Sequence, residues 1–388
     1  MTDYASYAKE LRRQLHMYPE IGFDLPKTLA LVKGELDKWG IPYTEQFGKS
    51  SVVATINAEK TTFTIGIRAD MDALPIQEEH TYEFASRHDG IMHACGHDAH
   101  TAILLATGRR LQDMKDQIPC RVKLLFTPAE EYIEPGCKQM AENGVMDDID
   151  CIISLHVDKD FPVGSVGVDA GGQGGNSMGF TVEFYGQASH AAQQHRGKDA
   201  IAMAVEAYVA MEMMAMKEVN PVEPRLLNIG SIHGGNTNNI LCNYCKLFGS
   251  SRTHSDEVSQ YLIDRITQIC EGIAQVNGGR AEVKVVKFLP YVINDPLITR
   301  KVYESAAKLL GEERIGHREK RTLGGEDFSF LCRKKPGMMF RLGSAGENPD
   351  THSAGHSVTF DIDEGCLQVG IDLFTQFVLD NMNGIEGL

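Results

Sequence analysis

The chain has 388 residues, of which 42% are hydrophobic and 23% are charged, values typical of a globular protein of two or three domains. Its formal net charge of −15 argues against a nucleic acid or an anionic membrane as a partner, because both attract basic surfaces. The polar N-terminus lacks the apolar core of a signal peptide, and no apolar run approaches the ~18 residues that span a bilayer. Nine scattered cysteines favour a reducing compartment. These features predict a cytoplasmic protein.

The first 160 residues predict alternating helices and strands. Residues 6–39 are expected to form a helix pair or one long broken helix. Buried strands are predicted at 51–56, 63–69, 121–127 and 150–157, with helices between them at 101–115 and 136–146. Because strands alternate with helices, the predicted fold class is α/β, with a mostly parallel sheet covered by helices.

A glycine-rich stretch near residue 170, DAGGQGGNS, marks a change of pattern, either as a hinge or as a turn within one domain. Beyond it the elements follow the β-α-β-β-α-β order of a ferredoxin-like domain: strand 178–185, helix 197–217, strands 226–232 and 244–251, helix 256–276 and strand 280–288. A helix at 297–311, a strand at 338–344 and a helix from about 364 return to the first domain. We therefore predict an α/β domain of residues 1–174 and 290–388, with an inserted domain of residues 175–289.

The segment MHACGHDAHTA, residues 92–102, concentrates polar side chains of one chemical kind: His93, Cys95, His97, Asp98 and His100. A polar loop that happens to be rich in histidine would explain it. Thiolate, imidazole and carboxylate are also the ligands that borderline-soft divalent cations select. The cluster alone leaves both interpretations open.

Further polar residues follow the predicted strands of the α/β domain: Asp70 and Asp72, Glu130 and Glu131, His156, and His352 with His356. Each has an ordinary explanation, such as a helix cap, a solvated helix start or a hydrogen-bonded histidine. In a parallel α/β sheet, however, ligands bind beyond the carboxyl ends of the strands, so these segments are expected to converge. Their convergence with the cysteine–histidine cluster favours a metal site.

Eight motifs in order make a resemblance specific: RRQLHMYPEIGF, RADMDALP, MHACGHDAHTA, TPAEE, SLHV, GQASH, GGEDFS and HSVTFDIDE. From about residue 10 to residue 370 the chain resembles the aminoacylase/carboxypeptidase-type dinuclear metallopeptidases. It is most similar to the amidohydrolase branch that contains hippurate hydrolases and indole-acetyl amino acid hydrolases. The resemblance implies a catalytic α/β domain with an inserted lid.

The resemblance also implies that two divalent metal ions (Mn, Zn, Co or Ni) are bound by Cys95, His97, Glu131, His156 and His356. Cys95 would be the bridging thiolate. His356 fits better than His352, because Ser357 and Phe360 follow it as the family pattern requires.

Three further catalytic roles follow from the same resemblance. Glu130 would be the general base, since a carboxylate bound to a metal, such as that of Glu131, has lost its basicity. Asp72 would orient a metal ligand. His190, in the lid, would stabilise the tetrahedral oxyanion, often across a dimer interface.

Substrate-binding positions are also implied for the lid. Asn239 and Arg252 match positions that hold the substrate's carboxylate, a task that suits the bidentate fork of arginine. His195 completes this predicted set, although no proline precedes it as the family pattern expects.

The predicted function is metal-dependent hydrolysis of the amide bond of N-acyl or N-aroyl amino acids, or of related small amides and dipeptides, by a homodimer formed through the lid domain. Two alternatives remain. In a metal-free thiol hydrolase, Cys95 would be the nucleophile, which leaves Glu130, His156 and His356 unexplained. A non-catalytic binding module of the same fold is disfavoured, because every ligand position and the base position are filled.

Overall fold

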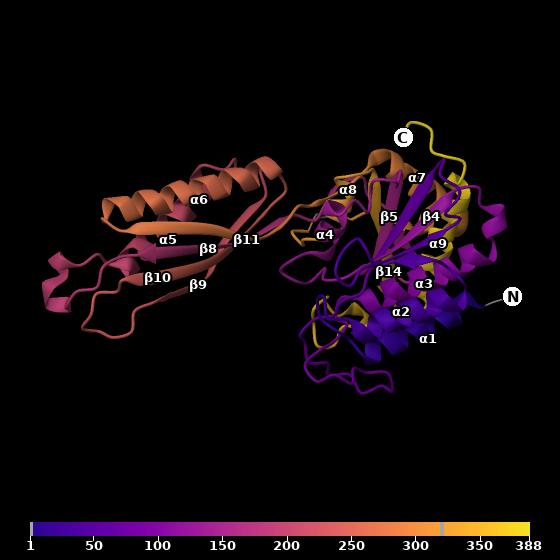
Figure 1. Cartoon of the computed structure of the whole chain (residues 1–388), viewed down its shortest axis with the longest axis horizontal. Helices are drawn as coiled ribbons and strands as arrows, with labels where there is room; N and C mark the ends of the chain where they lie inside the picture. Colours follow the sequence, from indigo (N-terminus) through magenta and orange to yellow (C-terminus); the bar gives the residue numbers. More distant parts are fainter. Residues whose placement is uncertain (1–2, 319–321) are drawn as a thin grey trace. The chain divides into compact units, whose positions relative to one another are not determined.

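A computed structural model describes residues 3–318 and 322–388 (Figure 1). The described residues divide into two compact units. The large unit comprises residues 3–173, 292–318 and 327–388, and the inserted unit comprises residues 174–291 and 322–326. The sequence places residues 322–326 in the large domain, but Gly324 accepts a hydrogen bond from the backbone of Gly175 at 3.0 Å, which ties this segment to the inserted unit. No helix in the described chain is long and apolar enough to cross a membrane.

Eight strands of the described chain form the sheet of the large unit, in the order β1-β2-β4-β3-β5-β14-β6-β13. Their bounds are β1 (Tyr43–Thr44), β2 (Val52–Ile56), β3 (Thr64–Asp70), β4 (Arg121–Thr127), β5 (Cys151–Pro162), β6 (Val166–Gly167), β13 (Ile315–Gly316) and β14 (Gly337–Ala345). The central strands β4, β3, β5 and β14 are parallel, whereas β2 and β6 join this core antiparallel. The predicted α/β class with a mostly parallel sheet is confirmed.

Helices cover both faces of this sheet (Figure 1). One face carries α1 (Tyr4–Met17), α2 (Pro26–Lys38), α3 (His97–Asp113), α7 (Pro296–Leu310) and α9 (Cys366–Asn381), and the other carries α4 (Gly136–Glu142) and α8 (Ser329–Cys332). Strand side chains alternate between the two cores: Ile153 and Leu155 of β5 face the first set of helices, and Ile152 faces the second. Strands β7 (Gly171–Gln173) and β12 (Val292–Asn294) form a separate two-stranded antiparallel sheet.

The inserted unit has the predicted ferredoxin-like arrangement. Its elements are β8 (Asn176–Tyr185), α5 (Ala200–Lys217), β9 (Arg225–Gly234), β10 (Tyr244–Thr253), α6 (Asp256–Val276) and β11 (Arg280–Leu289). The strands form an antiparallel sheet in the order β11-β8-β10-β9, and both helices pack on one face of it. The predicted helix 197–217 begins at Ala200, because the Asp199 carboxylate caps it by accepting the Ile201 N–H at 2.9 Å.

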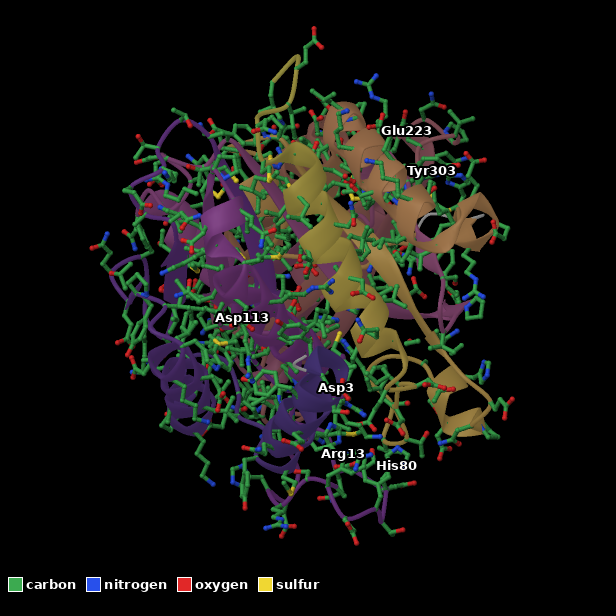
Figure 2. All side chains as sticks on the ribbon, turned by 90° about the vertical axis from the view of Figure 1, so that its right-hand side faces the viewer. Asp3, Arg13, His80, Asp113, Glu223 and Tyr303 are labelled. Carbon is green, nitrogen blue, oxygen red and sulfur yellow. The ribbon has the colours of Figure 1, made fainter. Side chains whose placement is uncertain are left out.

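Helix α1 is fastened along α3 at both of its ends. Asp3 caps α1 by accepting the Ser6 N–H at 3.0 Å, and the adjacent Tyr4 hydroxyl donates to Asp113 at the end of α3 (2.8 Å; Figure 2). At the opposite end of α1, Arg12 reaches Asp98 in the first turn of α3. The contacts between α1 and α3 thus extend from the first turn of α3 to its last residue.

A buried network of charges surrounds the first turn of α3. The Arg12 guanidinium donates to Asp98 at 3.1 Å and to Asp361 at 2.9 Å. The His16 ring contacts Asp98 at 2.8 Å and Glu78 at 3.2 Å. Because burying these charges is costly unless each has a partner, the network specifies how α1, α3 and the flanking loops meet.

Helix α3 begins at His97, not at residue 101. His97, Asp98 and His100 of the cysteine–histidine cluster therefore lie in its first turn, and His93 and Cys95 lie in the segment that leads into it. The turn into the helix depends on Gly96, whose φ of +88° lies in the left-handed region. A Cβ atom on this residue would also lie 2.4 Å from Cγ2 of Val157, far inside contact distance.

We expect Gly96→Ala to lower the melting temperature, because the new methyl group combines backbone strain with a clash against Val157 of β5. Thermal unfolding followed by circular dichroism measures this. Gly34→Ala in α2 is the matched control, since no atom lies within 4 Å of a Cβ built there, and this change should be neutral or stabilising. Equal melting temperatures for both variants would contradict the expectation.

The His16 contacts predict a pH dependence of stability. Burial lowers the pKa of His16, but hydrogen bonds to Asp98 and Glu78 outweigh it and raise the pKa from 6.5 to about 9. A raised folded-state pKa means that protonation stabilises the fold fully below the unfolded pKa, and that this contribution is lost as pH rises through about 9. We expect a contribution of about 3 kcal/mol to the free energy of unfolding.

Urea unfolding of the parent chain and of His16→Gln, between pH 6 and pH 10, checks this prediction. The difference in unfolding free energy between the two chains should shrink as pH rises. A difference that is constant with pH would show that His16 is neutral in the folded chain.

Candidate metal centre

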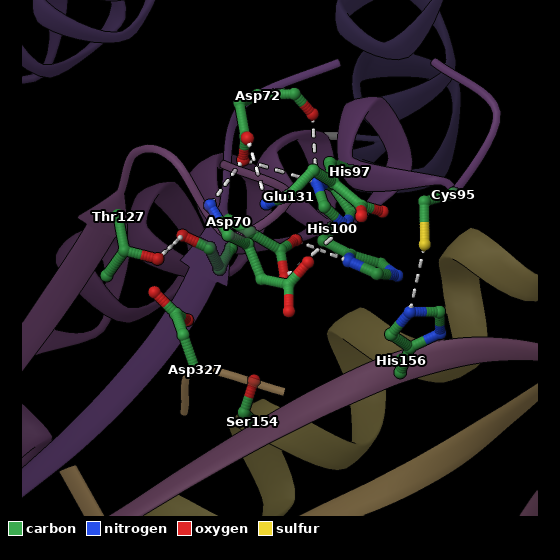
Figure 3. A network of polar contacts seen from close by, with 12 residues as sticks. Asp70, Asp72, Cys95, His97, His100, Thr127, Glu131, Ser154, His156 and Asp327 are labelled. Atoms are coloured by element: carbon green, nitrogen blue, oxygen red, sulfur yellow. Dashed lines mark hydrogen bonds and ion pairs between the residues drawn. The ribbon is translucent and has the colours of Figure 1, made fainter. Parts of the chain in front are cut away.

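Five side chains from four segments of the large unit converge at the carboxyl side of its parallel strands. Figure 3 shows four of them, Cys95, His97, Glu131 and His156. Cys95 and His97 flank the start of α3, Glu131 follows β4, His156 lies in β5, and His356 follows β14. Their ligand atoms form two groups, Cys95–His97–His156 and Cys95–Glu131–His356, within each of which all atoms lie within 4.8 Å of one another. The Cys95 sulfur belongs to both groups, as a thiolate shared by two cations would.

Buried His97 and half-buried His156 each present a nitrogen to this space. His97 Nδ1 lies 2.8 Å from the Asp72 carbonyl, to which it donates, so Nε2 is the ring nitrogen that faces the other potential ligand atoms. Within the described chain that buried Nε2 has no hydrogen-bond partner. His156 Nε2 lies 3.4 Å from Cys95 Sγ (Figure 3). An unpartnered buried nitrogen beside a thiol fits a cation, which both atoms would ligate.

Burial also sets the protonation of these groups. It lowers the pKa of His156 well below its usual value, with the neighbouring His100 and Arg341 adding to the effect, so this imidazole is neutral and able to ligate. Burial and the Glu131 carboxylate raise the pKa of the Cys95 thiol well above its usual value. The thiol is therefore protonated in the metal-free chain, and a cation bound here would displace that proton.

Asp72 organises the loop that follows β4. Its carboxylate oxygens accept the backbone N–H of Glu130 at 3.0 Å and of Glu131 at 3.1 Å, and its carbonyl accepts from His97. The loop turns at Ala129, whose φ of +58° is unusual for a residue with a side chain. Asp72 thus orients a histidine and two carboxylates without facing the open site itself.

The two glutamates occupy different positions in this loop. Buried Glu130 joins His97 and Glu131 in a third group of potential ligand atoms within 4.8 Å. Glu131 Oε1 lies 2.9 Å from His356 Nε2. Burial raises the pKa of Glu131, but the contact with His356 outweighs this and lowers it, so the carboxylate is ionised.

His356 and His352 are separated by the fold. His356 has a φ of +66° and donates its backbone N–H to Ala94 at 2.8 Å, which brings its exposed ring to Cys95 and Glu131. His352 instead lies against the carbonyl of Gly346 at 2.9 Å, outside the ligand groups. Strained backbone at a ligand is typical of a functional position that the surrounding structure enforces.

The rest of the cysteine–histidine segment serves other purposes. Asp98 belongs to the charge network around Arg12. His93 is buried, and neither ring nitrogen has a hydrogen-bond partner in the described chain. His100 contacts the Asp70 carboxylate at 2.6 Å.

A network of buried ion pairs lies next to the site. The sequence alone does not show that these charged residues contact one another. Arg68 Nη1 donates to Asp70 at 2.7 Å and Nη2 donates to Asp327 at 2.5 Å (Asp327 is labelled in Figure 3). Asp70 lies in the motif RADMDALP and Asp327 lies in the motif GGEDFS, so these motifs were the sequence signal that pointed to both acids. The pairing of Arg68 with Asp327 across 259 positions could not be read from those motifs.

The residues predicted for the lid lie at two ends of the inserted unit. Exposed His190 and Asn239 are neighbours, because Ala191 donates its N–H to the Asn239 carbonyl at 3.0 Å; exposed His195 lies in the 3-10 turn that follows. Half-buried Arg252 lies near the end of β10, opposite Ser177 at the start of β8. At a rise of about 3.4 Å per residue, the strand from Tyr244 to Arg252 separates the two ends by roughly 27 Å.

Comparison with known proteins gives consistent matches. Residues 66–380 match peptidase family M20/M25/M40. The chain is 36% identical to the N-acetyl-L-cysteine deacetylase of Bacillus subtilis (strain 168), over 92% of this chain and 84% of that protein. It is 34% identical to the N-acyl-L-amino acid amidohydrolase of Geobacillus stearothermophilus, over 70% of this chain and 74% of that protein.

A solved structure agrees with these matches. The dinuclear metal-binding peptidase of the M20 family from Bacillus subtilis superposes with a TM-score of 0.81 at 29% identity, over 97% of this chain and 98% of that one. The family match, the similarity to amidohydrolases and the shared fold confirm the resemblance seen in the sequence motifs. The chain belongs to peptidase family M20/M25/M40.

Proposed function

We propose that the protein is a dinuclear metal-dependent amidohydrolase that releases an amino acid and a carboxylic acid from N-acyl or N-aroyl amino acids, related small amides or dipeptides. The observation that carries this proposal is the Cys95 sulfur shared by two groups of potential ligands, with Glu130 beside them. We assign Cys95, His97, Glu131, His156 and His356 as ligands of two divalent ions, which are Mn, Zn, Co or Ni.

The chain's own residues then divide the chemistry. Two bound divalent cations would lower the pKa of a shared water and polarise the scissile carbonyl. Glu130 takes the proton of that water on its carboxylate and delivers it to the nitrogen of the leaving amine. Asp72 keeps Glu130 and Glu131 at fixed positions through their backbone N–H groups.

The substrate class is supported by the relatives. One is named for removing an acetyl group from N-acetyl-L-cysteine and another for hydrolysing N-acyl-L-amino acids. A free thiol nucleophile at Cys95 is disfavoured, because nucleophilic cysteines have lowered pKa values and burial raises this one. The buried thiols of Cys120, Cys151 and Cys366, which form no disulfide, support a cytoplasmic location.

We expect the apo-protein supplied with Mn, Zn, Co or Ni to hydrolyse at least one substrate in a screen of N-acetyl amino acids, N-benzoyl amino acids and dipeptides. Glu130→Gln should keep both metals and lose turnover by about 10²- to 10⁴-fold, since it removes only the proton carrier. Glu131→Gln should instead lower metal content. Metal analysis by mass spectrometry and steady-state kinetics measure both effects.

Equal metal loss in the two variants would contradict the division between base and ligand. Activity that resists chelators but is abolished by alkylation would favour the thiol hydrolase. A chain that binds metal but hydrolyses none of these substrates would favour a binding module.

We further propose a homodimer formed through the inserted unit. The outer face of α5 carries apolar side chains at three- and four-residue spacing that are exposed in the single chain: Ile201 (37%), Val205 (50%), Val209 (56%), Met213 (50%) and Met216 (62%). Beside α5, strand β9 is an edge of its sheet. A continuous apolar helix face next to an open edge strand is typical of an interface between proteins.

The two ends of the inserted unit support an active site shared between subunits. The chain enters this unit at residue 174 and leaves at residue 291, the end that carries Arg252, so His190 lies at the far end. His190 Nδ1 accepts the Ala192 N–H at 3.1 Å, which places the ring proton on Nε2 as a donor. We assign His190 to the partner subunit's metal centre as oxyanion donor, and Asn239 and His195, which lie at the same end of the unit, to substrate binding there. Arg252, at the other end, is assigned to substrate binding as well.

We expect His190→Ala to keep its metals and to lose turnover by about 10²- to 10³-fold, the usual effect of removing one oxyanion donor. Mixing inactive Glu130→Gln and inactive His190→Ala chains should restore about a quarter of parent activity, because half of the dimers are hybrids with one intact site. The double variant Val205→Glu/Val209→Glu, followed by sedimentation, serves as the control that prevents dimerisation and abolishes recovery. No recovery after confirmed subunit exchange would assign His190 to its own subunit.

A further inference from the structure

His100 is buried beside the proposed metal centre but belongs to neither of its two ligand groups, Cys95–His97–His156 and Cys95–Glu131–His356. Its Nδ1 lies 2.6 Å from Asp70 Oδ1 (Figure 3), and its Nε2 accepts the backbone N–H of Val157 at 3.0 Å. An amide N–H can only donate, so Nε2 carries the lone pair and Nδ1 carries the proton. With both nitrogens engaged, His100 has none left for a cation, although it lies within reach of one.

Val157 connects this imidazole to a proposed ligand. Its N–H is held by His100, and its carbonyl oxygen lies 2.7 Å from Nδ1 of His156. His156 in turn presents Nε2 to Cys95. The orientation of one ligand ring therefore depends on a peptide unit that His100 holds in place.

The other partner of His100 is itself fixed. Asp70 accepts from Arg68 at 2.7 Å through its carboxylate and from Thr101 at 2.7 Å through its carbonyl. Arg68 also donates to Thr127 at 2.9 Å and is fully buried. A buried carboxylate held in this way is a rigid acceptor, and it lies 3.7 Å from His97 Nε2, where its charge favours a bound cation.

We propose that His100 and Asp70 are positioning residues of the metal centre, which hold Val157 so that His156 Nε2 faces Cys95. This inference rests on the proposed function and its ligand set, and it adds the two residues that orient the ligand His156. Outer partners of metal ligands contribute about 10- to 100-fold to metal affinity. The effect is expected for the ion of the Cys95–His97–His156 group.

Two substitutions separate the two hydrogen bonds of His100. In His100→Asn the side-chain amide replaces Nδ1 as donor to Asp70 and leaves the Val157 N–H without an acceptor. In His100→Gln the amide oxygen replaces Nε2 as acceptor from Val157. We expect His100→Asn to bind one of two Co²⁺ ions about 10- to 100-fold more weakly than the parent, and His100→Gln to recover part of this loss.

The readout is Co²⁺ affinity measured by competition with a chromophoric chelator, with the thiolate-to-cobalt absorption reporting Cys95. His93→Gln is the matched control, since His93 is a buried imidazole of the same segment whose nitrogens have no partner in the described chain. Its apo-protein should be destabilised in urea, while its Co²⁺ affinity and spectrum stay those of the parent.

Parent affinity for both ions in His100→Asn would overturn the proposal, and so would equal weakening in His100→Asn, His100→Gln and His93→Gln, which would mark a general effect on folding. A parent chain that binds no Co²⁺ would fail at an earlier step, and it would overturn the proposed metal centre itself.

Discussion

The parallel pairing of β4, β3, β5 and β14 is the constraint on which the rest of the large unit depends. Parallel strands end at the same edge of a sheet, and here both faces of the sheet are buried under helices. Polar side chains that follow the parallel strands therefore lie together at the edge of the sheet where these strands end. Asp72 and Glu131, which follow β3 and β4, meet there with His156, which lies within the longer strand β5.

Buried charge gives this edge its rigidity. Arg12 pairs with Asp98 at the first turn of α3, and Arg68 pairs with Asp70 under the ligands. Each ion would be costly alone in the interior, so the pairs persist only while all of their elements are in place. The histidines and carboxylates of the site are consequently oriented before any cation arrives, which is the arrangement that precise ligand geometry requires.

The inserted unit combines two kinds of surface. Its strands bury one face under α5 and α6, yet α5 also exposes an apolar outer face. A helix that is apolar on both sides is expected where it lies between its own sheet and a second protein surface. The same unit separates His190 from Arg252 by the length of a strand, which is the observation behind the proposed active site shared between two chains.

The sequence by itself determined the fold class and the chemistry of the site. Alternating helices and strands predicted the α/β sheet, and β-α-β-β-α-β order predicted the inserted ferredoxin-like unit, because these patterns depend on local periodicity. The motifs also determined the family, since eight short segments in a fixed order are far more specific than any one of them. Residue types alone indicated a metal site, and the resemblance carried by the motifs named Cys95, His97 and Glu131 as candidate ligands.

Only the tertiary structure decided which members of each cluster act together. The spacing of residues in the sequence could not show that His100 forms hydrogen bonds with Asp70 and Val157, or that Asp98 pairs with Arg12. These contacts join residues from 30 to 86 positions apart. Local pattern also missed the start of α3 at His97, which follows from the left-handed turn at Gly96. Periodicity reports which face of an element is buried, whereas the partner of a buried polar group depends on how distant elements pack.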